Sequence, residues 1–302
     1  MKMAALIKRN FLIYIRDKGA VFFSLLSMLV IILLMAVFLG NMNVDEILSI
    51  LKLYGGSRNA EEDMENARQL VLLWTIAGIL VVNSVTVSLA VLGTMVTDAQ
   101  EKRLMSFYTA PVKRIEIAIG YIVTSVTVTA VMCFLTLAVA ESWVLIKGGV
   151  LPGVKEHFKI AGLIVLNSIA SSSVMYLGAM WVKSNSAWSA LGTVVGTLVG
   201  FAGAIYLPMG MLPEAVGKVL KCLPLLHASA LMRDLFTQNS VETTFKGLDA
   251  RVAEEYREAM GISVVWNGEK IPPVFSICFL AGCAIIAIAV SAACMKNRKE
   301  RD

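Results

Sequence analysis

Six long apolar stretches constrain this chain more than any other feature of its sequence. Each is about 20 residues or more in length, which is enough for one α-helical crossing of a bilayer. A soluble domain would bury such a surplus only in part, because 57% of the residues are hydrophobic and only 16% are charged. The sequence therefore predicts an all-α integral membrane protein with six transmembrane helices. The stretches cover residues 19–40, 70–96, 117–140, 160–182, 186–211 and 272–295.

Basic residues predict the orientation of these spans. With six crossings, residues 1–18, residues 97–114, Lys183 and the tail after residue 295 all lie on one side, and all carry Lys or Arg. The first loop on the other side, around residues 45–65, is acidic. The positive-inside rule then places both termini in the cytoplasm. The net charge of +5 forms no continuous basic stripe, so we expect no nucleic-acid partner.

The N-terminal segment, residues 1–18, has the pattern of an amphipathic helix. Lys2, Arg9 and Arg16 recur every seven residues, and larger apolar residues gather on another face. Such a segment is typical of a helix that lies in the cytoplasmic interface of a membrane. The alternative is that these charges only set the topology.

The connection of residues 97–114 predicts a short cytoplasmic helix. Asp98 followed by Glu101 resembles an N-terminal capping pair, and Pro111 should end the element. Large apolar side chains in a short cytoplasmic loop usually contact something, either the bundle of this chain or another protein. The side chains concerned are Leu104, Phe107 and Tyr108.

The long loop of residues 212–271 is predicted to lie outside the cell. It opens with two short apolar segments, 214–223 and 225–236, separated by Pro224. Neither is long enough to span a bilayer, so we expect re-entrant helices packed on the bundle. An amphipathic helix is expected around residues 249–260.

The sequence contains none of the common signatures of a hydrolytic or metal site. None of its glycines belongs to a phosphate-binding G-x-x-x-x-G-K-[ST] loop, and neither HExxH nor GxSxG occurs. His157 and His227 fall in separate external segments. We therefore expect no catalytic residue, metal or cofactor in this chain.

Four glycines mark the fifth apolar stretch. The first three are spaced by four residues, a small-xxx-small pattern that allows two helices to approach closely. Packing within one chain and contact at a dimer interface or mobile gate remain equally open interpretations. The residues are Gly192, Gly196, Gly200 and Gly203.

Spans two to four carry mild polar groups, of which Asn83, Thr86, Asn167 and Ser171 are candidates to line a pathway. Hydrogen bonding between helices is the favoured alternative. No Asp, Glu, Lys or Arg lies in the middle of any of the six spans. Ion-coupled carriers commonly place a charge there, so the pattern indicates an energy source elsewhere.

Taken together, the order of these elements resembles the permease subunits of ABC-2-type ATP-binding cassette exporters. The resemblance covers nearly the whole chain, as one permease domain of residues 1–302. It depends on the N-terminal amphipathic helix, the glycine-rich fifth span, the re-entrant pair and the basic tail. Its most family-like part is Glu101-Lys102-Arg103-Leu104 followed by Pro111-Val112-Lys113-Arg114.

The resemblance implies a half-transporter in a prokaryotic plasma membrane. Two permease subunits, identical or paralogous, would form the pathway, and two separate ATPase subunits would bind ATP and Mg. The helix after Asp98 would couple to the ATPase, and the N-terminal helix would brace it. The implied coupling residues are Asp98, Glu101, Arg103, Leu104, Phe107, Tyr108 and Pro111.

Two other functions stay open at the level of sequence. A stand-alone channel or secondary carrier would work without ATP, although the lack of charge within the spans disfavours it. A membrane scaffold or immunity-type protein would bind a partner and transport nothing.

Overall fold

The structure is a computed structural model that describes residues 2–34, 40–56, 58–104 and 114–298. In these ranges the chain is almost entirely helical, and one short hairpin is the described sheet. The elements are α1 (Lys2–Arg16), α2 (Lys18–Leu34), α3 (Gly40–Tyr54), α4 (Ala60–Gln100), α6 (Arg114–Ile146), α7 (Val154–Trp181), α8 (Asn185–Ala202), η2 (Met209–Met211), α9 (Glu214–Lys221), α10 (Pro224–Thr244), α11 (Ala250–Ala259), β1 (Val265–Trp266), β2 (Glu269–Lys270) and α12 (Pro273–Arg298).

Four of the described helices, α4, α6, α7 and α12, are long and apolar enough to cross a membrane. The pair α9 and α10 passes the same test jointly but is bent by 87° at a short break, as a broken span or a re-entrant loop would be. The all-α membrane fold predicted from the sequence is confirmed. The count of six spans stays a prediction, because α2 and α8 fall outside this set.

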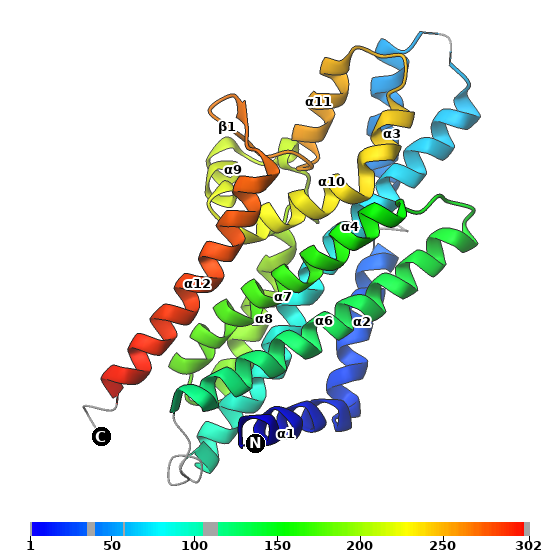
Figure 1. The fold of residues 1–302 in the computed structure, drawn as a ribbon. Helices are drawn as coiled ribbons and strands as arrows, with labels where there is room; N and C mark the ends of the chain where they lie inside the picture. Colours follow the sequence, from blue (N-terminus) through cyan, green and yellow to red (C-terminus); the bar gives the residue numbers. More distant parts are fainter. Residues whose placement is uncertain (1, 35–39, 57, 105–113, 299–302) are drawn as a thin grey trace.

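Helix α4 is the central element of the bundle. It packs against α6, α7 and α10, and also against α2, α3 and α8. In the most apolar 18-residue stretch of α4, 89% is buried inside the protein. The corresponding share for α12, which lies at the edge of the bundle, is 28% (Figure 1). A helix buried in this way needs no lipid contact of its own, and its apolar residues therefore serve as the common core.

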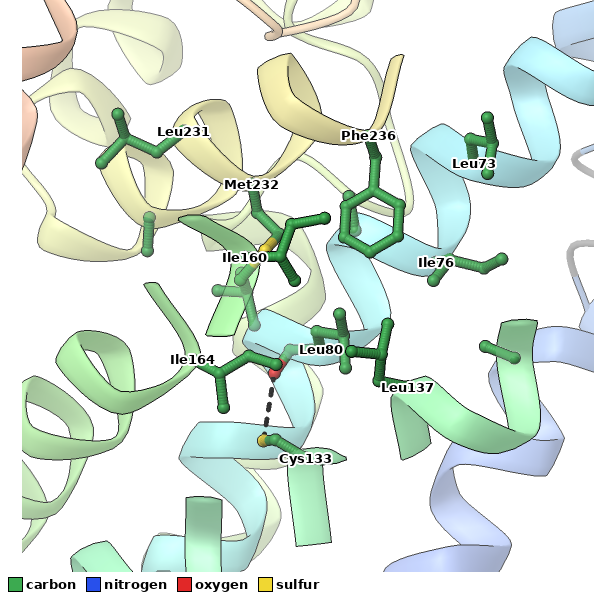
Figure 2. Close-up of a cluster of buried hydrophobic side chains, with 14 of the residues drawn as sticks. Leu73, Ile76, Leu80, Cys133, Leu137, Ile160, Ile164, Leu231, Met232 and Phe236 are labelled. Carbon is green, nitrogen blue, oxygen red and sulfur yellow. Dashed lines mark hydrogen bonds between the residues drawn. The ribbon is translucent and has the colours of Figure 1, made fainter. Parts of the chain in front are cut away.

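Figure 2 shows how four helices build that core. Leu80 of α4, Leu137 of α6, Ile164 of α7 and Met232 of α10 belong to one buried cluster. The thiol of Cys133 lies 3.7 Å from the main-chain oxygen of Leu80 in the same cluster. Since these side chains come from segments far apart in the sequence, the cluster fixes α10 onto the membrane helices and does not leave it as a free loop.

The two ends of the bundle differ in what covers them (Figure 1). The α1 end carries α1, the last turns of α4 and the described end of α12. The α11 end carries α3, α9, α11 and the β1–β2 hairpin. At the α1 end, the predicted amphipathic helix is confirmed as α1. It packs closely on α6, because a Cβ added to Gly120 of α6 would lie only 2.7 Å from Cδ2 of Leu6 in α1.

At the α11 end, the helices expected in the long loop are present with changed bounds. The segment around residues 249–260 forms α11, with Asp249 accepting from the Arg251 amide at its N-terminus. Pro224 begins α10, as a proline at the first helical position often does. The helix then continues to Thr244, beyond the apolar run, because Phe236, Thr237, Ser240 and Val241 keep one face buried.

The fifth apolar stretch is not one continuous helix as predicted. Helix α8 ends at Ala202, with Gly203 as its cap, and the chain turns through Ala204, which has a φ of +52°. A non-glycine residue in this conformation is uncommon and stops the helix. The rest of the stretch folds back as an irregular segment and the turn η2, so the predicted end at Met211 is wrong.

Candidate functional site

The predicted coupling residues lie at the α1 end, where α4 stops. The expectation that Asp98 begins a short helix is wrong, because Asp98 lies in the last turn of α4 and Glu101 is the C-terminal cap. The helix continues past Asp98 because this carboxylate has partners from other helices and does not bind the local amides. Arg103 and Leu104 follow the cap, whereas Phe107, Tyr108 and Pro111 lie outside the described residues.

Asp98 is the centre of a junction between three helices. Its carboxylate is 2% exposed. Arg9 of α1 donates to both of its oxygens, from Nη1 to Oδ2 at 2.7 Å and from Nη2 to Oδ1 at 2.8 Å. Tyr121 of α6 donates its hydroxyl to Oδ2 at 2.6 Å. A bidentate arginine–carboxylate pair fixes both direction and distance, so α1 and α6 are locked onto the end of α4.

Charge around this junction favours the ionised pair. The hydrogen bond to Asp98 raises the pKa of Arg9, against the opposing effect of its partial burial. Arg103, just past the end of α4, lies 3.5 Å from Asp98 Oδ1 and also pairs with Glu101. Arg103 and Glu101 are both about half exposed, in contrast to Asp98. The exposed pair therefore lies where a partner can reach it, directly beside the buried junction.

The first turn of α8 is tied to the same end of α4. The Asn185 amide donates to Gln100 Oε1 at 2.7 Å, and the hydroxyl of Thr97 donates to Asn185 Oδ1 at 3.1 Å. One turn deeper, Trp188 Nε1 donates to the Leu89 oxygen at 3.2 Å. Three helices, α1, α6 and α8, are thus hydrogen-bonded to the C-terminal turns of α4.

The polar residues proposed to line a pathway lie mostly between helices of this chain. Asn83 donates to Thr136 Oγ1 at 2.7 Å, and Asn167 donates to Ser84 Oγ at 2.7 Å. Ser171 shares a hydrogen bond of 3.1 Å with the same Ser84. All three candidates are buried, whereas Thr86 is half-buried and bonds to carbonyls of its own helix. The structure therefore places these groups as contacts between α4, α6 and α7.

The four glycines of the fifth stretch do different things. Gly192 faces α4, where an added Cβ would lie 3.2 Å from Leu89 Cδ2. Gly196 faces open space, because a Cβ added there would have no atom of the described residues within 4 Å. Gly200 and Gly203 lie under the folded-back segment, against the ring of Tyr206 and against Ile205 and Ser229. Among the described residues, Gly196 is thus the one glycine of the four with open space for a second helix.

The α11 end contains a second junction that sequence reasoning missed. Arg233 of α10 is completely buried, and its guanidinium lies 4.2 Å from the centre of the Trp74 ring of α4. It donates to the Ala204 oxygen at 2.8 Å, to the Gly261 oxygen at 3.3 Å and to the Met260 oxygen at 3.4 Å. One arginine therefore joins α4, α10, the end of α8 and the end of α11.

The signal for Arg233 is present in the sequence as a lone arginine within the apolar run of residues 225–236. That run is too short to count as a span. Because charged residues were considered only within the predicted spans, Arg233 was not identified. A charge in a short apolar segment packed on a bundle is as costly to bury as one in a span. Such a residue needs a set of buried acceptors, and here main-chain oxygens supply them.

No group of three or more His, Cys, Asp or Glu side chains suited to a metal occurs within the described ranges. His157 and His227 lie apart, in α7 and α10, and each is bound within the protein. His157 contacts Glu141, with Nε2 to Oε1 at 2.7 Å, and His227 contacts Ser276, with Nδ1 to Oγ at 2.9 Å.

Comparison with known families gives one clear match. A family model described as ABC-2 type transporter matches residues 1–237. The matched part contains the junction of Arg9, Asp98 and Tyr121, the buried Arg233, and the bent pair α9 and α10 as far as Thr237. No curated protein matches the chain.

Proposed function

The chain belongs to the ABC-2 type transporter family, and from this premise we propose that it is the permease subunit of an exporter that works as a dimer and is driven by a separate ATPase subunit. The chain is a multi-pass membrane protein and a permease-type transporter. ATP and Mg would be bound by the partner subunit. The second permease in the dimer is a copy of this chain or a paralogue.

In this proposal the α1 end faces the cytoplasm and the α11 end faces outward. The basic segments of the sequence lie at the α1 end, including α1 itself and the last residues of α12, which supports this orientation. Residues 1–302 form one permease domain, residues 97–114 form the coupling loop, and residues 212–271 form the extracellular loop with its re-entrant helices. A prokaryotic plasma membrane is the proposed location.

The observation that carries the coupling part of the proposal is the junction of Arg9, Asp98 and Tyr121. It lies immediately before the loop that we assign to the ATPase contact. A displacement of this loop would move α4 directly, because Asp98 lies in the last turn of that helix. Helix α4 has 41 residues and so is about 60 Å long, reaching from the coupling loop to the α11 end.

Helix α1 has the role of a brace in this mechanism. The bidentate bond between Arg9 and Asp98 keeps the end of α4 from turning relative to α1 and α6. Movement of the coupling loop then displaces the three helices together and is not lost in local bending. The exposed pair Arg103 and Glu101 provides charges for the ATPase to bind, and Phe107 is expected to provide an apolar contact.

The proposal is tested by co-purification from mild detergent, with an ATPase assay on the eluate. We expect a stoichiometric ATPase subunit with the wild-type chain and its loss with Glu101→Lys or Phe107→Ala. The matched control is Glu62→Lys, which reverses an exposed charge in the first turn of the same helix, at the α11 end. Its co-purification should equal wild type.

Elution of the wild-type chain without an ATPase, even after cross-linking in the membrane, contradicts the exporter proposal. Unchanged co-purification and transport in both coupling variants contradicts the assignment of the coupling loop alone. The two parts of the proposal are thus tested separately.

A further inference from the structure

A groove of about 600 Å³ is lined by residues of α9 and α11. Figure 1 shows these two helices at the α11 end of the bundle. Helix α9 contributes Glu214, Gly217, Lys218 and Lys221, which are spaced by three and four residues and so lie on one face. Helix α11 contributes Glu255, Glu258 and Ala259 with the same spacing. Two helical faces are therefore turned toward one space.

The two walls of the groove carry opposite charge. Lys218 and Lys221 give the α9 wall a net positive charge, although Lys218 pairs with Glu214 on its own helix. Glu255 and Glu258 make the α11 wall negative, although Glu255 pairs with Arg251 on its own helix. Among the described residues, neither Lys221 nor Glu258 has an ion-pair partner. Opposite charges thus face the groove without neutralising each other across it.

The floor between the walls is apolar. It is formed by Met209, Leu212 and Val265, which are partly exposed and belong to η2, the turn after it and β1. Ser263 also lines the groove. The residue is only 9% exposed, and its hydroxyl has no hydrogen-bond partner in the described structure. A buried hydroxyl without a partner costs free energy unless a ligand or water binds it.

We propose that this groove binds a zwitterionic amphiphile, a molecule with an amine, an anionic group such as phosphate, and an alkyl chain. The amine would lie against Glu255 and Glu258, and the anionic group against Lys218 and Lys221. The alkyl chain would cover the apolar floor. The inference builds on the proposed export function, for which it places such a molecule at the outward-facing end.

Charge complementarity selects this class over simpler ligands. A purely anionic ligand is attracted by the α9 wall but repelled by Glu255 and Glu258, and a purely cationic one meets the reverse. A small zwitterion without a chain satisfies both walls but leaves the partly exposed Met209, Leu212 and Val265 in contact with water. Only a molecule with all three parts matches both walls and the floor.

The test measures binding to the purified permease by native mass spectrometry in a neutral detergent. The probes are lysophosphatidylethanolamine, lysophosphatidylglycerol, which has the phosphate and chain but no amine, and phosphoethanolamine, which has no chain. We expect the first to bind about tenfold more tightly than either of the others, because each lacks one set of contacts.

Paired variants test each wall. In Glu255→Gln with Glu258→Gln, the advantage of lysophosphatidylethanolamine over lysophosphatidylglycerol should disappear. In Lys218→Gln with Lys221→Gln, both phospholipids should bind about tenfold more weakly. The matched control is Glu254→Gln, on the same helix but outside the groove, where the carboxylate pairs with Lys270. It should bind all probes as wild type does.

Equal binding of the two lysophospholipids to the wild-type chain overturns the proposal. So does binding by phosphoethanolamine as tight as by the chain-bearing lipid, which would identify a soluble zwitterion as the ligand. Wild-type selectivity in the paired glutamine variants, with unchanged thermal unfolding, overturns it as well. Because the permease is tested alone, failure here leaves the ATPase-coupling result unaffected, and the reverse also holds.

Discussion

Two arginines at opposite ends of α4 hold the bundle together in different ways. Arg9 at the α1 end is 30% exposed in its side chain and binds the carboxylate of Asp98. Arg233 at the α11 end is fully buried and binds main-chain oxygens and the face of Trp74. Each arginine connects several helices, but only the first has a charged partner among the described residues.

The difference lies in what it costs to open each junction. Arg9 can regain water when its bond to Asp98 breaks, and Arg103 lies close enough to take its place beside the carboxylate. Arg233 has no such route, because moving it leaves a charge and several carbonyl oxygens buried without partners. The junction at the α1 end therefore costs less free energy to break than the one at the α11 end, which is the more firmly fixed of the two.

The largest effect is expected from Arg233→Met. This change keeps much of the length of the side chain but removes the guanidinium donors to the Ala204 and Gly261 oxygens, while the Met260 oxygen keeps its hydrogen bond from Trp74 Nε1. We expect the free energy of unfolding to fall by about 2–4 kcal/mol, because two buried main-chain oxygens lose their donors. Thermal unfolding in detergent, followed by intrinsic tryptophan fluorescence, measures the loss. The control Arg251→Met, at an exposed position, should leave the midpoint unchanged.

A smaller but still marked effect is expected from Gly261→Ala. Gly261 has a φ of +64°, and an added Cβ would lie 3.0 Å from Arg233 Nη1 and 3.1 Å from Met209 Cγ. Strain and crowding together should cost about 1–3 kcal/mol. Gly268→Ala is the matched control, since it has a φ of +83° but open space around it. A loss equal in the two variants would assign the effect to backbone strain alone.

At the α1 end, Asp98→Asn should affect transport more than stability. The amide keeps the shape of the carboxylate but cannot hold Arg9 with two charge-assisted bonds. We expect a loss of about 1–2 kcal/mol in unfolding free energy, because Arg9 can turn to solvent. ATP hydrolysis by the complex should continue while transport falls several-fold. Transport and hydrolysis that decline together, or not at all, contradict the brace proposed for α1.

The smallest effect is expected from Tyr121→Phe, which removes one hydrogen bond to Asp98 and leaves the bidentate pair intact. A loss of about 1 kcal/mol in unfolding free energy is expected, with near-normal coupling. Thermal unfolding and the ratio of transport to hydrolysis give both values. If Tyr121→Phe uncouples transport as strongly as Asp98→Asn, then the tyrosine and not the arginine fixes the end of α4.

A third arginine adds a contact of a different kind at the α11 end. Arg58, just before α4, donates to the oxygens of Thr244 and Lys246 at the end of α10. Its pKa is raised by its hydrogen bond to Asp63. It therefore caps one helix while it pairs with the first turn of another, which adds to the fixed character of the α11 end.

Local patterns predicted much of the fold. The amphipathic pattern of residues 1–18 predicted α1, the amphipathic segment after Asp249 predicted α11, and Pro224 predicted the break before α10. Each of these features depends on residues within one or two helical turns, which is the range over which periodicity and capping act. The Asn267-Gly268 turn of the β1–β2 hairpin is equally local, with φ values of +51° and +83°, although the hairpin was not predicted.

The errors arose where a residue had a distant alternative. Asp is a residue type that often caps the N-terminus of a helix. The carboxylate of Asp98 instead binds Arg9 and Tyr121, which are stronger partners than the local amides. Ala204 lies in an unbroken apolar run, but its oxygen accepts from Arg233, and the chain turns there. In both cases a tertiary contact contributed more free energy to folding than the local preference that it replaced.

The sequence by itself determined that this chain is a helical membrane protein, because apolar length and the need to satisfy the backbone in lipid leave few other solutions. It also placed the charges that favour one orientation. Only the tertiary structure decided which charges meet. Arg9 and Asp98 are 89 residues apart, and Arg233 meets Gly261 and Ala204 through two different turns. Such pairs depend on how helices pack, and packing depends on the whole set of side chains that fill the core.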